Sequence, residues 1–479
     1  MLMRKTINNL FYQIIFQLAK IAIPVITVPI VSKALGPSGV GLYNYTNSIA
    51  QYVIIASGLG ITLYGNREIA RTRDSMIDKS KVFWELVLLK SVVTIVLLLA
   101  YLYLSSFSNN KFLYYAQGLS ILSVLFDISW FFMGIEDFKK VTLVNIFFQV
   151  LTLLAIVKFI KTADDVLIYI LIQGIGILMS QYFVWFFIIK KVIFIKPKFS
   201  SILFHFKKSL GYFIPQVAVL LYTNLNKTIL GVFTNNDSVA FYSNAQTINT
   251  MIILLITTLD TVLLPKMSYL SAKSNRKQML IIIKKAIHIQ LFFSIAAMFG
   301  LLSICQTLVP WFFGPDFLFL NKLIPLFAPL VIVVPLGMAI SRQYLLPTGN
   351  IKEYNISVMI GALISIMINV TTIHFLGIYS AVLATILSEF FVSGSRLYSF
   401  VKKESFTFDY KLIFKYFVSG LIMMFGVFFL TNYLGLAKTM MSNIIQIGFG
   451  LSLYFIFTGL LNVNPIIEIG KGVIYERKK

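Results

Sequence analysis

The sequence has 479 residues, of which 58% are hydrophobic and 12% are charged, and its formal net charge is +23. Soluble chains have about 25% charged residues, so this composition is typical of a membrane protein and leaves no room for a soluble catalytic domain. A positive charge of this size in a soluble protein would indicate a nucleic-acid partner, but here the basic residues form no patch with interleaved aromatic residues.

Long apolar stretches follow one another along nearly the whole chain and are joined by loops that are almost all short. A helix of about 20 residues crosses about 30 Å of hydrocarbon, so each stretch predicts a membrane-spanning helix. The first stretch is longer than the apolar region of a signal peptide, and we expect it to be retained. The sequence therefore predicts an all-α polytopic membrane protein with fourteen spans: Asn9–Ser32, Leu42–Tyr64, Val82–Ser105, Phe112–Met133, Val141–Ile160, Val166–Ile189, Leu210–Phe233, Ala240–Leu264, Ile281–Ile304, Leu323–Leu346, Ile356–Phe375, Ile378–Phe400, Leu412–Tyr433 and Ile444–Leu461.

The basic residues predict the orientation of these spans. Most of the 41 Lys and Arg residues lie in alternate loops, and this set includes both termini. Cytoplasmic loops carry an excess of Lys and Arg, so both termini are expected to be cytoplasmic. The loops on the opposite side hold only a few basic residues: Lys33, Lys111, Lys158, Lys161, Lys322 and Lys438.

A weak internal repeat predicts two halves. Val40-Gly41-Leu42-Tyr43 opens the second span and Val239-Ala240-Phe241-Tyr242 opens the eighth, at an offset of 199 residues. The longest cytoplasmic linker, from Lys190 to Lys208, separates six spans from the next six. We expect an N-lobe at 1–195, a C-lobe at 196–404, and two appended helices with a cytoplasmic tail at 405–479. Halves related in this way carry their substrate site between them, near the bilayer midplane.

Polar side chains recur at helical spacing on the first two spans of each predicted half. Such stripes predict a wet cavity shared by the two lobes, and amides suit sugar hydroxyls. Membrane helices also use amides to hydrogen-bond one another, so this alternative stays open. The candidate sugar-binding residues are Gln13, Gln17, Asn47, Gln51, Asn224, Gln246 and Asn249.

Charged residues within the spans are the most informative. Lys20 lies near the middle of its span, where a cation costs about 2.5–3.5 kcal/mol and nothing acidic in that span relieves it. Cations suit a phosphate or pyrophosphate group, so the cavity predicts an anionic glycolipid head group. Lys90 and Arg342 lie toward span ends, where they could instead snorkel to the interface. The candidate pyrophosphate-binding residues are Lys20, Lys227, Arg342 and Lys90, and the carboxylates that could take a coupling ion are Asp127, Asp260 and Glu389.

Four segments resemble the Wzx-type polysaccharide flippases of the multidrug/oligosaccharidyl-lipid/polysaccharide exporter superfamily. They are KALGPSGVGLY at 33–43, YGNREIA at 64–70, WFFMGIEDF at 130–138 and FGPDF at 313–317. The resemblance implies a V-shaped bundle of two six-helix lobes that flips an undecaprenyl-diphosphate-linked oligosaccharide to the outer leaflet by alternating access. It also implies the bacterial cell membrane, a surface-polysaccharide pathway, and partners that include membrane lipids and a polysaccharide polymerase. No cofactor is expected apart from a coupling H+ or Na+.

Three alternatives to this function stay open. A teichoic acid or lipid II flippase needs nearly the same cavity, and lipid II flippases resemble this chain in having two helices beyond the family's usual twelve. A drug/cation antiporter of the same superfamily should have an acidic cavity, whereas this chain has Lys20. A membrane polymerase or ligase needs catalytic groups on large outer loops, but the longest outer loop here, from Cys305 to Lys322, holds only Asp316 as an acid. The sequence therefore predicts a transporter without enzymatic activity.

Overall fold

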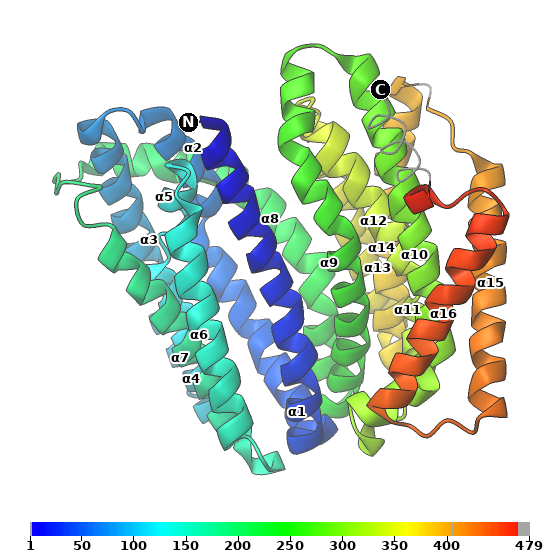
Figure 1. The fold of residues 1–479 in the computed structure, drawn as a ribbon. Coiled ribbons are helices and arrows are strands. Elements are labelled where there is room, and N and C mark those ends of the chain that lie inside the picture. The colour runs from blue at the N-terminus through cyan, green and yellow to red at the C-terminus, as the bar shows by residue number, and fades with distance from the viewer. Residues whose placement is uncertain (1, 405, 468–479) are drawn as a thin grey trace. The chain divides into compact units, whose positions relative to one another are not determined.

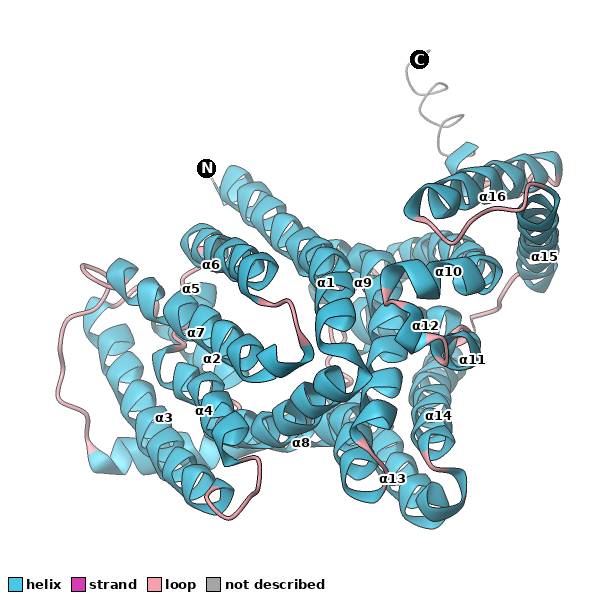
Figure 2. Ribbon diagram, turned by 90° about the horizontal axis from the view of Figure 1, so that it is seen from below, coloured by secondary structure: helices cyan, strands magenta, loops and turns pink. Residues whose placement is uncertain are grey.

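The computed structural model describes residues 2–404 and 406–467, with side chains from Gln17 onward. The described ranges consist of helices joined by loops and contain no strand (Figures 1 and 2). Hydrocarbon offers no water to backbone N–H and C=O groups, and a helix pairs all of these groups internally. The helices are α1 (Leu2–Gly58), α2 (Ile61–Thr72), α3 (Met76–Ser105), α4 (Lys111–Phe126), α5 (Ser129–Gly134), α6 (Phe138–Phe159), η1 (Ala163–Asp165), α7 (Val166–Val184), η2 (Trp185–Phe187), α8 (Phe199–Phe233), α9 (Asn236–Ala272), α10 (Arg276–Phe312), η3 (Pro315–Phe317), α11 (Leu320–Phe327), α12 (Leu330–Ile340), η4 (Ser341–Leu345), α13 (Ile351–Leu376), α14 (Ile378–Glu404), α15 (Tyr410–Tyr433) and α16 (Met440–Leu460).

Twelve helical stretches of the described chain are long and apolar enough to cross a membrane. One of them, Gln17–Thr72, covers the first two spans expected from the sequence. Helix α8 contains the expected span Leu210–Phe233 but is not among the twelve. These two places account for the difference from the expected number. The chain is an all-helical, multi-pass membrane protein.

Helix α1 is two helices joined across a kink. Gly36 lies at the kink with a φ of 63° and a ψ of −179°, outside the helical region. A positive φ is costly for residues with a Cβ and is readily adopted by glycine. Pro37 follows it and has no N–H to continue the helical ladder. The single non-helical residue at the kink therefore separates the first expected span from the second, in place of a loop.

The chain forms two compact units, Met1–Ala240 and Phe241–Lys479. In the first unit, α1 packs against α4, α6 and α8, and α7 packs against α4 and α6. Helix α8 follows the long linker and lies against α1, α2 and α3 within this unit. The lobe boundaries expected at 195 and 404 stay predictions.

The expected fourth span is broken inside the first unit. Helix α4 ends at Phe126, and the Asp127 carboxylate accepts a hydrogen bond of 2.9 Å from the Ser129 N–H at the start of α5. The buried Lys90 ammonium donates to the backbone carbonyl of Asp127. A lysine and a carboxylate thus satisfy backbone groups that the helix break would leave without partners.

In the second unit, α10 packs against α12, α15 and α16, and α13 pairs with α14. A buried network holds the last two helices to α10. The Thr307 hydroxyl donates to the Gln446 amide oxygen at 2.8 Å, and the Gln446 amide N–H donates to Thr431 at 2.7 Å. The Asn443 amide donates to both Thr307 and Gln446. Such hydrogen bonds hold membrane helices together, because the hydrophobic effect gives no driving force for their association in lipid.

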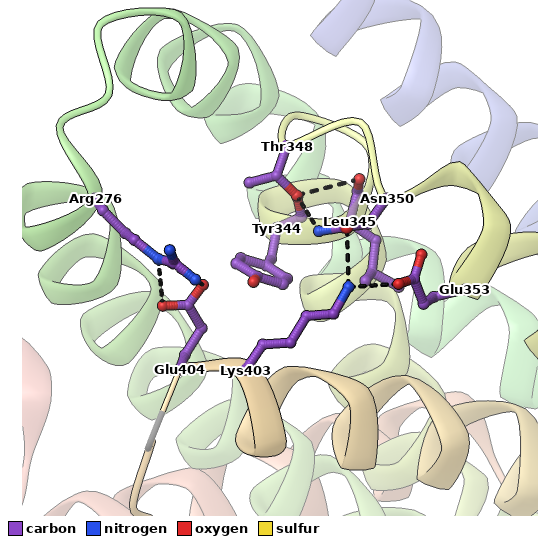
Figure 3. A network of polar contacts seen from close by, with 8 residues as sticks. All are labelled: Arg276, Tyr344, Leu345, Thr348, Asn350, Glu353, Lys403 and Glu404. Carbon is purple, nitrogen blue, oxygen red and sulfur yellow. Dashed lines mark hydrogen bonds and ion pairs between the residues drawn. The ribbon is translucent and has the colours of Figure 1, made fainter.

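A second polar network ties the ends of three helical segments of this unit together (Figure 3). Arg276, at the start of α10, forms a bidentate ion pair with Glu404 at the end of α14, with donor–acceptor distances of 2.6 to 2.9 Å. The adjacent Lys403 donates to the Asn350 amide oxygen and to Glu353 at the start of α13 (Figure 3). Both networks lie within the second unit.

Candidate functional site

A polar cavity lies inside the first unit, between α1, α6 and α7. Its volume is about 370 Å³. Each of the three helices contributes one face, and side chains at spacings of three or four residues share a helical face. The lining residues are Lys20, Ile23, Pro24 and Thr27 from α1, Asn145, Gln149, Thr152, Leu153 and Ile156 from α6, and Gln173, Gly176, Ile177, Ser180 and Gln181 from α7.

The cavity wall combines amides and hydroxyls with apolar side chains. The Ser180 hydroxyl donates to the Asn145 amide oxygen across the α6–α7 contact. The amide oxygens of Gln149 and Gln181 are buried and have no hydrogen-bond partner in the described chain. A buried acceptor left without a donor costs about 1–3 kcal/mol. These two oxygens are therefore suited to accept hydrogen bonds from a bound hydroxyl-rich ligand.

Gly176 allows α6 and α7 to approach closely at this wall. A Cβ built on Gly176 would lie 2.1 Å from Oγ1 of Thr152, closer than real contacts permit. The glycine therefore lets the polar faces of the two helices meet. The cavity shape depends on this contact.

Lys20 brings positive charge to the cavity. It is exposed, and none of the lining side chains that the structure describes is acidic. An ammonium beside amides and hydroxyls can bind a phosphate oxygen while the amides bind neutral hydroxyls. The local chemistry therefore fits a ligand with an anionic and a hydroxyl-bearing part.

The structure does not bring the other predicted residues of the first unit to this cavity. Gln17 is half-buried on α1 and is not among the lining residues, and the Gln13 side chain lies outside the described residues. Gln51 donates to Asn47 at 3.4 Å on the second arm of α1.

Asn224 joins two helices instead. Its amide donates to the Ser48 backbone carbonyl at 2.8 Å, and the Ser48 hydroxyl bonds Thr228 at 2.9 Å. These contacts form a polar seam between α8 and the second arm of α1. Lys227 is half-buried on α8 beside this seam. Asn224 therefore hydrogen-bonds a neighbouring helix, which is the alternative to sugar binding that the sequence left open.

The predicted residues of the second unit fall in separate places. Asn249 is buried on α9 and donates to the Ala245 carbonyl at 3.1 Å, while Gln246 is half-buried on the same helix. Glu389 is half-buried on α14. Asp260 and Arg342 are the exception: Asp260 is fully buried, and Arg342 donates to the hydroxyl of the adjacent Thr261 at 3.1 Å.

Sequence reasoning missed most of the cavity. Asn145, Gln149 and Thr152 lie four and three residues apart on α6, and Gln173, Gly176 and Ser180 lie three and four apart on α7. Both stripes have the same helical spacing that identified polar faces on the earlier spans. The spacing signal was therefore present in the sequence, on spans outside the first two of the half.

The chain matches the polysaccharide biosynthesis protein family over residues 6–271, more than half of its length. A putative O-antigen transporter of Escherichia coli K12 is 24% identical over 75% of this chain and 88% of its own length. A probable low-salt glycan biosynthesis flippase of Haloferax volcanii is 26% identical over 57% of each chain.

Two solved structures share the fold. The lipid II flippase MurJ, in an inward closed conformation, has a TM-score of 0.76 at 19% identity and covers 94% of this chain and 98% of its own. An inward-facing multidrug resistance transporter of the MATE family has a TM-score of 0.63 at 14% identity, covering 80% of this chain and 96% of its own. The family match confirms the expected resemblance at the level of the family, and the chain belongs to the polysaccharide biosynthesis protein family.

Proposed function

We propose that the chain moves undecaprenyl-diphosphate-linked oligosaccharide units from the cytoplasmic to the outer leaflet of a bacterial cell membrane, for a surface polysaccharide. The observation that carries this proposal is the cavity of Lys20, Gln149 and Gln181. The cavity combines one cation, which suits a phosphate, with unpartnered amide acceptors, which suit sugar hydroxyls. A sugar on a phosphorylated lipid carries both groups. On this proposal the protein is a carrier and not an enzyme.

The transport cycle that we propose is alternating access. Fourteen helices would form two six-helix lobes and an appended pair, with both termini cytoplasmic as the loop charges predict. The lobes would rock as the site opens to one side of the membrane and then to the other. The lipid tail would stay in the membrane. Such a cycle accounts for a polar cavity in a bundle whose outer surface is apolar.

Within this class, a lipid II or teichoic acid flippase is the second candidate, and the MurJ-like fold favours it. Its substrate also joins a phosphorylated lipid to a sugar, so the cavity chemistry suits both. A drug/cation antiporter is disfavoured because the described lining of the cavity contains Lys20 and no acid. The two kinds of flippase should differ in the sugar head group that the cavity binds, and the antiporter should differ from both in binding a cationic ligand.

The proposal is tested by removing the charge on Lys20. A charge-assisted hydrogen bond contributes about 1.5–3 kcal/mol, which corresponds to about 10- to 100-fold in affinity. We expect Lys20→Ala to weaken binding of undecaprenyl diphosphate to the purified protein by this factor and to reduce export in cells that lack the chromosomal copy. Lys20→Arg should keep much of both.

Lys33→Ala is the matched control, because Lys33 is an exposed lysine on the same helix and does not line the cavity. It should leave binding and export unchanged. Full export and unchanged affinity in Lys20→Ala, and likewise in Lys227→Ala, both expressed at the normal level, would refute the cationic-cavity proposal. Tighter binding of cationic drugs than of undecaprenyl diphosphate would favour the antiporter.

A further inference from the structure

The linker before α8 and the first turns of α8, residues 190–208, interleave lysines with aromatic and aliphatic residues. Figure 2 draws the linker as the long loop at the edge of the first unit. Every Lys, Arg, Asp or Glu residue in this segment is a lysine, so the segment has no negative charge of its own. We call it the basic linker surface. Its lysines are Lys190, Lys191, Lys196, Lys198, Lys207 and Lys208.

Aromatic side chains of the basic linker surface face outward. Phe194 is 75% exposed, Phe199 is 81% exposed and Phe204 is 55% exposed. We expected from the sequence that the basic residues form no patch with interleaved aromatic residues, and this segment is an exception that the exposure of its rings reveals. Exposed apolar side chains gathered in one place mark a site of interaction with another protein, a ligand or a membrane.

Helix α3 holds the middle of this segment in place. The Ile193 N–H donates to the buried Ser80 hydroxyl at 3.0 Å, and the Trp84 indole N–H donates to the Ile193 carbonyl at 3.0 Å. The Trp84 ring also meets the Phe194 ring edge to face, with centroids 5.4 Å apart. Both backbone groups of Ile193 are therefore paired within the protein. A surface that is already ordered loses less conformational entropy when it binds a partner.

Most of the lysines are available to a negatively charged partner. Lys191 is half-buried and forms an ion pair with Asp137. The other lysines of the basic linker surface are exposed, and no salt bridge joins them to an acid among the described side chains. One lysine close to an anionic membrane surface contributes about five-fold in affinity. The surface is thus complementary in charge to anionic head groups.

The position of the segment favours a lipid over a soluble partner. It begins a few residues after Ala163–Phe187, a stretch long and apolar enough to span a membrane, so it lies close to the boundary of the hydrocarbon. Lysines beside exposed phenylalanines are typical of segments that lie in this interface, where rings enter the head-group region and ammonium groups meet lipid phosphates. We infer that the basic linker surface binds anionic phospholipids of the adjacent leaflet. This inference does not rest on the proposed flippase function.

The test measures which lipids contact this segment in the reconstituted full-length protein. Ser200→Cys places an exposed thiol on the surface for a bimane label, and Cys305, the native cysteine, is buried and does not compete for it. Brominated lipids quench the label on contact. We expect brominated phosphatidylglycerol to be favoured about five-fold over brominated phosphatidylcholine, and high salt to reduce this preference. Phe199→Ser should reduce quenching by both lipids. Most of the preference should be lost in the combined variant Lys190→Gln, Lys196→Gln, Lys198→Gln and Lys207→Gln.

The matched control removes the same charge from exposed lysines of the second unit, in the combined variant Lys277→Gln, Lys284→Gln, Lys285→Gln and Lys352→Gln. It should keep the preference for phosphatidylglycerol. Equal quenching by the two lipids overturns the inference, and so does an equal loss of the preference in the control. The salt dependence is measured on the labelled protein without lysine substitutions, so it tests the inference even where a combined variant fails to fold. Binding of a soluble oligonucleotide or of polyglutamate through the same lysines, without a lipid preference, would assign the surface to a soluble partner instead.

Discussion

Replacement of Gly176 by alanine tests the close contact that shapes the cavity. The added Cβ would lie 2.1 Å from Oγ1 and 3.3 Å from Cβ of Thr152. Real Cβ atoms do not come within 3.0 Å of another atom, so the hydroxyl must turn away or the helices must separate by about 1 Å. Such overpacking costs about 1–3 kcal/mol. We expect Gly176→Ala to destabilise the protein by about this amount.

The assay is a double-mutant cycle on the free energy of unfolding in mixed micelles. Thr152→Ala removes Oγ1 and leaves only the 3.3 Å contact, so the double variant should recover most of the loss, with a coupling energy of about 1–2 kcal/mol. Gly118→Ala is the matched control, because its Cβ would meet Leu102 at an ordinary 3.4 Å. An additive cycle, or an equal loss in Gly118→Ala, would refute the close approach.

Three further variants test contacts within the units. Asn224→Leu removes the hydrogen bond to the Ser48 carbonyl and should lower the free energy of unfolding by about 0.6–2 kcal/mol, measured in the same micelles. Gln446→Leu removes the bonds that hold α16 to α10 and α15; we expect about 1–3 kcal/mol of destabilisation and faster proteolysis of the C-terminal helices. Arg276→Ala removes the bidentate partner of the Glu404 carboxylate, whose side chain is only 3% exposed, so we expect about 1–3 kcal/mol of destabilisation that salt screens only in part; a loss that vanishes at high NaCl concentration would contradict this.

The helical, membrane-spanning character of this chain follows from composition and span length alone, since hydrocarbon permits few other structures. The positions of most helices follow too. The sequence did not reveal the break at Asp127, because the apolar pattern continues through it. Nor did it reveal the kink at Gly36: the two helices meet across this single non-helical residue, where the sequence predicted a loop.

The candidate site was predictable only in part. Lys20 stands out because a mid-span cation is costly, and it does line the cavity. Asn224 belongs to a polar stripe at the helical spacing from which sugar binding was predicted, yet its amide donates to a backbone carbonyl. Spacing places a side chain on a helical face, but it does not say which neighbouring helix that face meets. That choice depends on tertiary packing, which no single span encodes.

The packing of α8 has a consequence for how the chain assembles. Its sequence follows the long linker at 190–198, but its side chains contact α1, α2 and α3. If the chain is cut in that linker, α8 belongs to the second fragment, whereas its packing partners α1, α2 and α3 belong to the first. Fragments cut at Asn235, after α8, would each hold one complete compact unit up to the start of α9. Co-expressed halves should therefore reassemble more readily from the later cut, so the best point of division lies a full helix beyond the visible linker.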